Sequence, residues 1–185
     1  MRKRLLVHIC CGPCATHTVE VLQASYDVAL FFYNPNIWPE DEYRRRLKAA
    51  RTLAKDFPAE LIEGEYDPLR FEELTAGHEH DQENGERCRI CFQLRLDTTA
   101  KRAKDYGFDA FTTTLPISVF KDKLLIRLSG KDSERRIGIP FLEVDLGGQE
   151  GFNRSRLLSR QHNLYRQKYC GCRYSLESSI ASPKL

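Results

Sequence analysis

The sequence lacks any apolar run near the roughly 20 residues that a membrane-spanning helix needs. The apolar segment that follows Met1-Arg2-Lys3-Arg4 is also too short for a signal peptide. Both absences lead us to expect a cytoplasmic protein without membrane contact. Repeats, low-complexity stretches and linkers are missing as well. With 41% hydrophobic and 30% charged residues, we expect one soluble globular domain over residues 1–185.

Strand and helix patterns alternate along the chain. Apolar runs predict five strands, over residues 5–9, 27–33, 59–63, 109–115 and 139–144. Helical spacing lies between them, most clearly in a long helix that begins near Cys88. This alternation is typical of an α/β fold, in which a parallel sheet is the middle of three layers and helices cover both faces. Ligands in such folds bind beyond the carboxyl ends of the strands, where we expect the functional site.

Common nucleotide-binding motifs are absent. The sequence has neither a GxGxxG motif nor a Walker A lysine loop. ATP-using tRNA-modifying enzymes of similar architecture carry a Ser-Gly-Gly phosphate loop after their first strand, and here cysteines occupy that position. We therefore do not expect nucleotide hydrolysis.

What the sequence does contain is seven cysteines in three groups: Cys10, Cys11 and Cys14; Cys88 and Cys91; Cys170 and Cys172. In a reducing compartment such cysteines are more often metal ligands or redox groups than a disulfide framework. The first two groups lie where helices are expected to begin. A helix N-terminus lowers the pKa of a thiol and so favours the thiolate that binds metal.

The number of thiols bears on which metal is bound. Five thiols in the first two groups exceed the four of a structural zinc site, and the adjacent Cys10 and Cys11 are poorly placed to chelate one small ion. A four-iron cluster, whose corners are spread out, fits better and leaves ligands for a second metal. We expect Cys10 and Cys11 to serve different irons. Zinc and unligated thiols are the alternatives.

The last cysteine group, Cys170-Gly171-Cys172, differs from the others. A disulfide between residues two apart closes a small ring with unrelaxed geometry, and strained disulfides are easily cycled. We expect a redox pair, with metal ligation and inert cysteines as alternatives. In the polar stretch before Cys88, Asp81 is a candidate oxygen ligand or proton donor, whereas His8, within a strand, is expected to be a core residue.

The formal net charge of +3 is unevenly distributed. Residues 151–185 carry seven basic residues and one acid, a charge of +6, which leaves −3 for the rest of the chain. We expect this basic segment to pack on the α/β body and to contact an anionic partner. A merely solvated basic tail is the alternative.

Five motifs are informative together: His8-x-Cys10-Cys11-Gly12-Pro13-Cys14, Tyr33-Asn34-Pro35-Asn36-Ile37, Glu83…Arg87-Cys88-x-x-Cys91-Phe92…Arg95-Leu96, Thr112-Thr113-Thr114-Leu115 and Tyr165-Arg166-Gln167-Lys168-Tyr169-Cys170-Gly171-Cys172. This combination resembles the QueH family of cobalamin-independent epoxyqueuosine reductases, and the resemblance spans His8 to Ser175. Asn84 departs from the family pattern, which has the first glycine of a pair at that position.

The resemblance implies a fold similar to the ATP-pyrophosphatase-like, Rossmann-like α/β domains. It also implies the reductive removal of the epoxide oxygen from epoxyqueuosine at the wobble position of tRNA with a GUN anticodon. The family's cofactors are a [4Fe-4S] cluster and an additional mononuclear iron, and the resemblance assigns their ligands to Cys10, Cys11, Cys14, Cys88 and Cys91. Cys10, Cys14, Cys170, Cys172 and Asp81 are then the expected catalytic residues.

The resemblance also directs attention to substrate contacts. Tyr33, Asn34 and Asn36, at the exit of a strand, are expected to hold the modified base. Arg154, Arg166, Lys168 and Tyr169 are expected to hold the anticodon loop, because loop bases are read by stacking and phosphates by basic side chains. We further expect an unidentified electron donor and a monomeric protein. Two other functions remain open: an iron–sulfur tRNA sulfur-transfer enzyme, and a zinc-stabilised RNA-binding module without activity.

Overall fold

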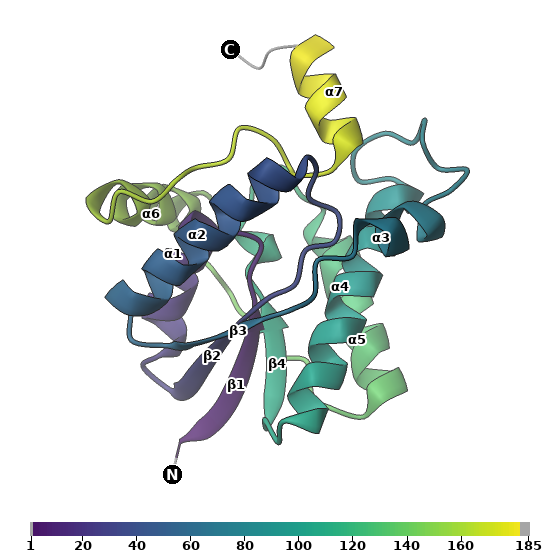
Figure 1. The fold of residues 1–185 in the computed structure, drawn as a ribbon. Helices are drawn as coiled ribbons and strands as arrows, with labels where there is room; N and C mark the ends of the chain where they lie inside the picture. Colours follow the sequence, from purple (N-terminus) through teal and green to yellow (C-terminus); the bar gives the residue numbers. More distant parts are fainter. Residues whose placement is uncertain (1, 182–185) are drawn as a thin grey trace.

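A parallel sheet of four strands forms the centre of the computed structural model, which describes residues 2–181 (Figure 1). The strands are β1 (Lys3–His8), β2 (Tyr26–Phe32), β3 (Glu60–Glu63) and β4 (Ala110–Thr113). They pair in the order β3-β2-β1-β4, and every pairing is parallel. The α/β class expected from the alternating pattern is therefore confirmed.

Helices connect the strands and cover the sheet. They are α1 (Gly12–Leu22), α2 (Glu40–Asp56), α3 (Pro68–Leu74), α4 (Glu86–Asp105), α5 (Lys123–Ile137), α6 (Gly148–Gln161) and α7 (Arg173–Ala181), with a short 3-10 helix, η1, at Leu115–Ile117. The long helix expected near Cys88 is α4, which begins two residues earlier. Over the described part of the chain, no helix combines the length and the apolar character needed to cross a membrane.

The prediction of a fifth strand at residues 139–144 is wrong. Phe141 forms a single parallel bridge, with Phe111. The Pro140 carbonyl accepts the Phe111 N–H at 3.0 Å, but Pro140 has no N–H of its own to donate. The Leu142 carbonyl accepts the Thr112 hydroxyl at 2.7 Å instead of a backbone N–H of a neighbouring strand. The ladder therefore does not extend beyond one bridge.

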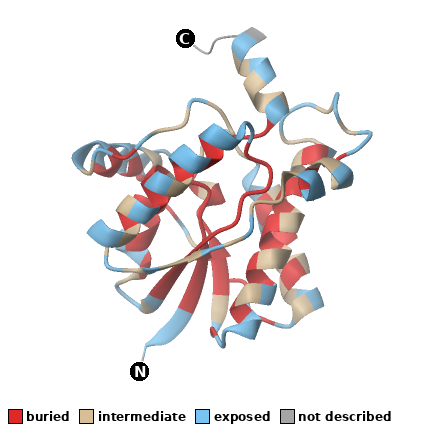
Figure 2. Cartoon of the chain, in the orientation of Figure 1, coloured by how far each residue is buried: buried red, intermediate tan, exposed pale blue. Residues whose placement is uncertain are grey.

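Both faces of the sheet are buried, as Figure 2 shows by the red strands between the helices. One apolar cluster joins the sheet to α1 and α2 and contains Leu5 and Val19. The other joins the sheet to α4 and α5 and contains Leu6 and Leu96. Successive strand residues point to opposite faces, so burial of both faces explains the unbroken apolar runs in the sequence.

The carboxyl ends of β1, β2 and β4 meet at one edge of the sheet. The Ile9 N–H donates to the Phe31 carbonyl at 2.9 Å, and the Thr114 N–H donates to the His8 carbonyl at 2.9 Å. The chain thus leaves all three strands side by side, directly before Ile9, Tyr33 and Thr114, and Cys10 follows Ile9. This edge is the rim at which ligands bind in parallel α/β folds.

Candidate metal and redox centre

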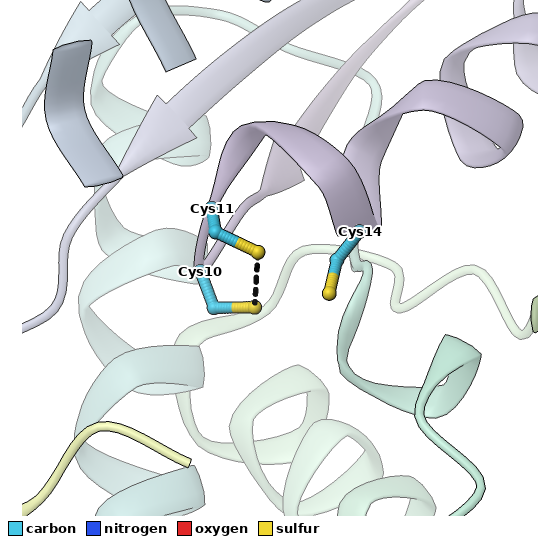
Figure 3. A group of neighbouring side chains, drawn as sticks. All are labelled: Cys10, Cys11 and Cys14. Atoms are coloured by element: carbon cyan, nitrogen blue, oxygen red, sulfur yellow. Dashed lines mark hydrogen bonds between the residues drawn. The ribbon is translucent and has the colours of Figure 1, made fainter. Parts of the chain in front are cut away.

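Three thiols meet where β1 ends and α1 begins. The sulfur atoms of Cys10, Cys11 and Cys14 all lie within 4.8 Å of one another, and those of Cys10 and Cys11 are 3.7 Å apart (Figure 3). Cys11 is the N-cap residue of α1, and Pro13 in the first turn suits the helix start that carries Cys14. These three soft donors, which we call the thiol group, are close enough to share a metal ion.

The short distance between the sulfurs of Cys10 and Cys11 bears on whether both cysteines can bind the same metal ion. In a tetrahedral thiolate site the metal–sulfur distance is about 2.3 Å, which gives sulfur–sulfur edges of about 3.8 Å. The Cys10 and Cys11 sulfurs, 3.7 Å apart, can therefore reach one ion, and adjacency alone does not separate them. The assignment of Cys10 and Cys11 to different irons stays a prediction.

Gly12 explains how this loop fits against the neighbouring helix. A Cβ atom at Gly12 would lie 2.6 Å from the Ala49 carbonyl oxygen and 2.9 Å from its carbonyl carbon. The glycine therefore allows the first turn of α1 to approach the backbone of α2, and this approach sets where Cys11 and Cys14 lie.

Charge is shared unequally within the thiol group. Hydrogen bonds from the Cys11 and Cys14 thiols hold the pKa of Cys10 well below its usual range. Burial and the neighbouring Cys10 raise the pKa of Cys11 to about 12. Hydrogen bonding with Cys10 and Cys11, together with burial, raises the pKa of Cys14 well above its usual range. One thiolate forms readily and the others need a cation, as expected of a metal-ligand set.

Cys88 and Cys91 lie at the start of α4, as predicted, but not within the thiol group. Cys88 Sγ accepts the Asn84 N–H at 3.3 Å, and Cys91 is buried. The expectation that the helix start lowers their pKa values is wrong. Burial raises the pKa of Cys88 and raises that of Cys91 to about 12, because a buried thiolate loses its solvation by water.

Arg95 connects the two cysteine groups. Its side chain is 2% exposed, and its guanidinium donates to Asn34 Oδ1 at 2.7 Å, to His8 Nε2 at 3.3 Å and to Cys91 Sγ at 3.8 Å. Asn34 Nδ2 in turn donates to the Ile9 carbonyl at 2.9 Å, directly before Cys10. Arg95 therefore ties α4 to the ends of β1 and β2.

His8 is the core residue that its strand position predicted. It is fully buried, and its Nδ1 lies 2.9 Å from Thr113 Oγ1. Burial and the Arg95 charge lower the pKa of His8 to about 3, so the imidazole is neutral. Sequence reasoning gave no role to Arg95. Its position four residues after Cys91, on the same helix face, was the available signal.

The turn Cys170-Gly171-Cys172 lies beside the second cysteine group. Lys121 Nζ donates to Cys170 Sγ at 2.8 Å, and Cys172 belongs to a buried cluster with Phe71 and Cys91. Both cysteines are free thiols. The fold thus brings the third cysteine group next to Cys91, although about eighty residues of sequence separate them.

Cations are unusually frequent inside this region. Arg46 and Arg95 are 1% and 2% exposed, and Lys121 is half-buried beside Cys170. Burial opposes the charge of Lys121, but Cys170 more than offsets that effect and raises the pKa of the lysine. Arg46 is paired with the buried Glu42 at 2.8 Å. A site rich in thiols and cations suits an anionic metal–thiolate group.

The remaining predicted residues lie around this centre in different settings. Asp81 accepts the Arg87 N–H at 2.8 Å and pairs with His78 at 3.1 Å, and the Arg87 N–H bond is the main cause of its lowered pKa. Asp81 thus holds the start of α4, and its role as a ligand or proton donor stays a prediction.

Tyr33 lines a hollow of about 410 Å³ beside α3 and α4.

Asn34 and Asn36 differ in what they can offer a ligand. Both ends of the Asn34 amide are used, by Arg95 and Ile9. Asn36 is 3% exposed, and its Oδ1 has no hydrogen-bond partner among the described residues. Two further buried oxygens share this property, those of Thr114 and Gln167, and Gln167 Nε2 lies 3.6 Å from Cys14 Sγ. Orphaned polar atoms at this rim fit a site that holds a polar group.

The predicted RNA-binding cations fall into two classes. Arg154 is paired with Glu20 at 2.5 Å, so its charge is already neutralised. Arg166 has no carboxylate partner within the described residues, and burial and the nearby Arg156 lower its pKa. Tyr169 uses its hydroxyl to donate to the Trp38 carbonyl. Lys168 lies in the same segment as Arg166.

Comparison with known proteins gives the family. The family model described as "Epoxyqueuosine reductase QueH" matches residues 5–178. The chain belongs to the QueH family. Several bacteria have proteins named epoxyqueuosine reductase QueH that are similar in sequence to this QueH chain. The one from Streptococcus pyogenes is 36% identical over 181 residues, with 95% of this chain and 71% of that protein covered. The one from Thermotoga maritima is 33% identical over 175 residues, with 93% and 90% covered.

A solved structure supports the fold of this QueH chain independently. A predicted subunit of a tRNA methyltransferase from Methanocaldococcus jannaschii superposes with a TM-score of 0.60. The match covers 85% of this chain and 74% of that one, at 15% sequence identity. The two chains thus share the α/β fold. The QueH motifs, by contrast, contain the cysteines of the thiol group, Arg95 and the turn Cys170-Gly171-Cys172, which we call the cysteine turn.

Proposed function

We propose that this chain reduces epoxyqueuosine in tRNA to queuosine. The observation that carries the proposal is the thiol group at the carboxyl edge of the sheet, in a chain that belongs to the QueH family. Removal of the epoxide oxygen consumes two electrons and two protons and yields an alkene and water. The substrate class is tRNA with a GUN anticodon, and an external donor supplies the electrons.

The residues that would hold the cofactor are Cys10, Cys11, Cys14, Cys88 and Cys91. A [4Fe-4S] cluster with an additional iron, when bound, supplies one-electron transfer and a Lewis acid for the epoxide oxygen. The donor set fits this group because it consists of thiols at two neighbouring helix starts. The buried Arg46 and Arg95 offset the negative charge that such a group brings.

Cys170 and Cys172 can supply what the reaction consumes. Oxidation of two thiols to one disulfide releases two electrons and two protons, the same numbers that convert an epoxide to an alkene and water. Cys172 packs in one buried cluster with Cys91, so the pair lies beside the proposed ligands. An external dithiol would then reduce the disulfide for the next turnover.

The candidate substrate contacts are mainly the polar side chains that have no partner within the described residues. Arg166 and Lys168, which have no carboxylate partner in the described chain, would bind phosphates of the anticodon loop, and Tyr169 lies next to Lys168 in sequence. Arg154 would contribute only by exchanging its Glu20 partner for a phosphate. Asn36 Oδ1, buried and without a partner, would accept a hydrogen bond from the modified nucleoside. Tyr33 would contribute a ring at the exit of β2.

Nucleoside analysis of tRNA tests the proposal. A strain deleted for this gene should accumulate epoxyqueuosine, and the wild-type gene should restore queuosine. Anaerobically purified protein with a low-potential chemical reductant should convert epoxyqueuosine-containing tRNA to queuosine without ATP. The Cys14→Ser variant should lose iron and activity together. A thiolated nucleoside formed with ATP, or a colourless zinc protein without sulfide, would contradict the proposal.

A further inference from the structure

Three successive carbonyls of the cysteine turn are held from one side. Arg46 of α2 donates from Nη1 to the Cys170 carbonyl at 2.8 Å and from Nη2 to the Tyr169 carbonyl at 3.1 Å. The Trp38 N–H, just before α2, donates to the Gly171 carbonyl at 2.9 Å. The backbone of the turn is therefore fixed to α2 and to the segment that leads into it.

Arg46 is itself fixed. Its Nε donates to Glu42 Oε1 at 2.8 Å, and the Tyr165 hydroxyl donates to Glu42 Oε2 at 2.6 Å. Arg46 is 1% and Glu42 5% exposed. Burial of two charges is costly, so a pair this deep marks a defined arrangement rather than a source of stability. The planar guanidinium has a donor for each of its three acceptors, which a lysine could not provide in this geometry.

Gly171 allows the turn to approach this arginine. Its φ is +140°, a backbone conformation that side chains rarely adopt, and a Cβ atom there would lie 3.1 Å from Arg46 Nη1. It would also lie 3.3 Å from Asn36 Nδ2. The glycine of the Cys-Gly-Cys motif is therefore suited to this position for two reasons: it adopts the backbone conformation of the turn, and it leaves room for the Arg46 side chain.

A second cation holds the sulfur side of the turn. Lys121 Nζ donates to Cys170 Sγ at 2.8 Å and lies 5.7 Å from the centre of the Phe92 ring. In the part of the chain that the structure describes, Lys121 has no carboxylate partner, so Cys170 is its acceptor. Arg46 on the carbonyls and Lys121 on the sulfur together hold Cys170 at both ends.

We propose that Arg46 and Lys121 are positioning residues that stabilise the dithiol form of Cys170-Gly171-Cys172. This inference rests on the redox role proposed above for the pair. Both cysteines are free thiols here, and a disulfide would require their sulfurs to close to about 2.05 Å. We expect that closure to draw Cys170 Sγ away from Lys121 and to loosen the Arg46 hold on the Cys170 carbonyl. Stabilisation of the reduced form makes a pair more oxidising and hence easier to reduce. An external dithiol that gives up two electrons and two protons, and itself becomes a disulfide, then restores both thiols.

The dithiol–disulfide equilibrium of the pair tests this role. Anaerobic holoprotein is equilibrated at stepped ratios of reduced to oxidised glutathione and alkylated, and the tryptic peptide Tyr169–Arg173 is quantified by mass spectrometry. In Lys121→Met, and in Glu42→Gln/Arg46→Met, the constant for disulfide formation should rise at least tenfold. A tenfold change corresponds to a midpoint potential about 30 mV lower. The double variant leaves no unpaired carboxylate, and the amide oxygen that it introduces at position 42 can still accept from Tyr165.

Arg44→Met is the matched control, since the exposed Arg44 pairs with Glu40 at 2.8 Å on the same helix. Its equilibrium should equal that of the wild type. An unchanged equilibrium in both test variants, or a wild-type pair that forms no disulfide at any ratio, would overturn the inference. Reduction of epoxyqueuosine by a low-potential chemical reductant bypasses the pair. Failure of that reaction would count against the proposed function and leave the equilibrium measurement unaffected.

Discussion

Arg95 shows how much one buried side chain can decide. It is almost without exposure, yet it donates to Asn34 and Cys91 and lies 3.3 Å from His8. These partners come from the ends of β1 and β2 and from α4 itself. A polar network of this kind fixes a geometry because each buried partner left unpaired is costly.

Replacement of Arg95 by Met should therefore reduce both stability and metal content. The free energy of unfolding should fall by about 1–3 kcal/mol, because Asn34 Oδ1 is left buried without its donor. Iron and sulfide should fall as well, since Cys91 loses the cation beside it. Urea unfolding of the apoprotein and metal analysis of the anaerobic protein measure the two effects.

The matched control is Lys101→Met, at an exposed position farther along α4. An exposed substitution should change stability by no more than about 0.5 kcal/mol and leave the iron content intact. Full iron content in Arg95→Met would show that the arginine serves the fold alone.

At the scale of elements, the packing of α1 on α2 places the thiol group. Gly12 is the point of contact, because a Cβ atom there would meet the backbone carbonyl of Ala49 at 2.6 Å. Backbone cannot move aside as a flexible side chain can. The same α2 carries Arg46, so one helix positions both the thiol group and the cysteine turn.

The Gly12→Ala substitution should push the first turn of α1 away from α2. Overpacking of this kind costs about 1–3 kcal/mol, and we expect iron content to fall because Cys11 and Cys14 move with that turn. Thermal unfolding and iron analysis check the two parts of the prediction.

Gly107→Ala provides the comparison for Gly12→Ala. Gly107 has a φ of +67° and open space around its Cα, so alanine there should cost about 1–2 kcal/mol through backbone strain alone. Its iron content should be that of the wild type. Equal iron content in the two variants would contradict the view that α1 packing places the ligands.

At the scale of the whole molecule, the fold separates free cations from paired ones. The basic C-terminal segment is not a uniform surface: Arg154 is paired with Glu20 and Arg173 with Glu72. Arg166, by contrast, lies near Arg156 without a carboxylate partner in the described residues. Phosphate would relieve this like-charge crowding, whereas a paired arginine gains little.

Arg166→Gln should consequently weaken binding to a synthetic anticodon stem-loop and reduce its salt dependence. The slope of log Kobs against log salt concentration is negative, and each lost phosphate contact makes it less steep by about 0.7–0.9. Fluorescence anisotropy at several salt concentrations measures the slope, without any need for redox activity. Arg135→Gln, an exposed arginine of α5 paired with Asp132, should keep the wild-type slope. Equal slopes for Arg166→Gln and the wild type would exclude the phosphate contact.

The fold class and the positions of the cysteine groups can be predicted from the amino-acid sequence alone. Apolar runs and helical spacing are local, and local periodicity is sufficient to predict a parallel α/β sheet. It was not sufficient at residues 139–144, where an apolar run around Pro140 forms only one bridge. Whether residues 139–144 form a strand depends on which backbone N–H and carbonyl groups of the neighbouring strand are free to pair with them. The sequence of the segment itself does not contain this information.

Which of these residues lie together depends on the folded chain. It joined Cys10, Cys11 and Cys14 within 4.8 Å and placed Cys172 beside Cys91. It also reversed the expected pKa shift of Cys88, because the pKa is raised by burial, which is a property of the folded environment. The roles of Arg46 and Lys121 belong to the same class, since their partners are 124 and 49 residues away in sequence.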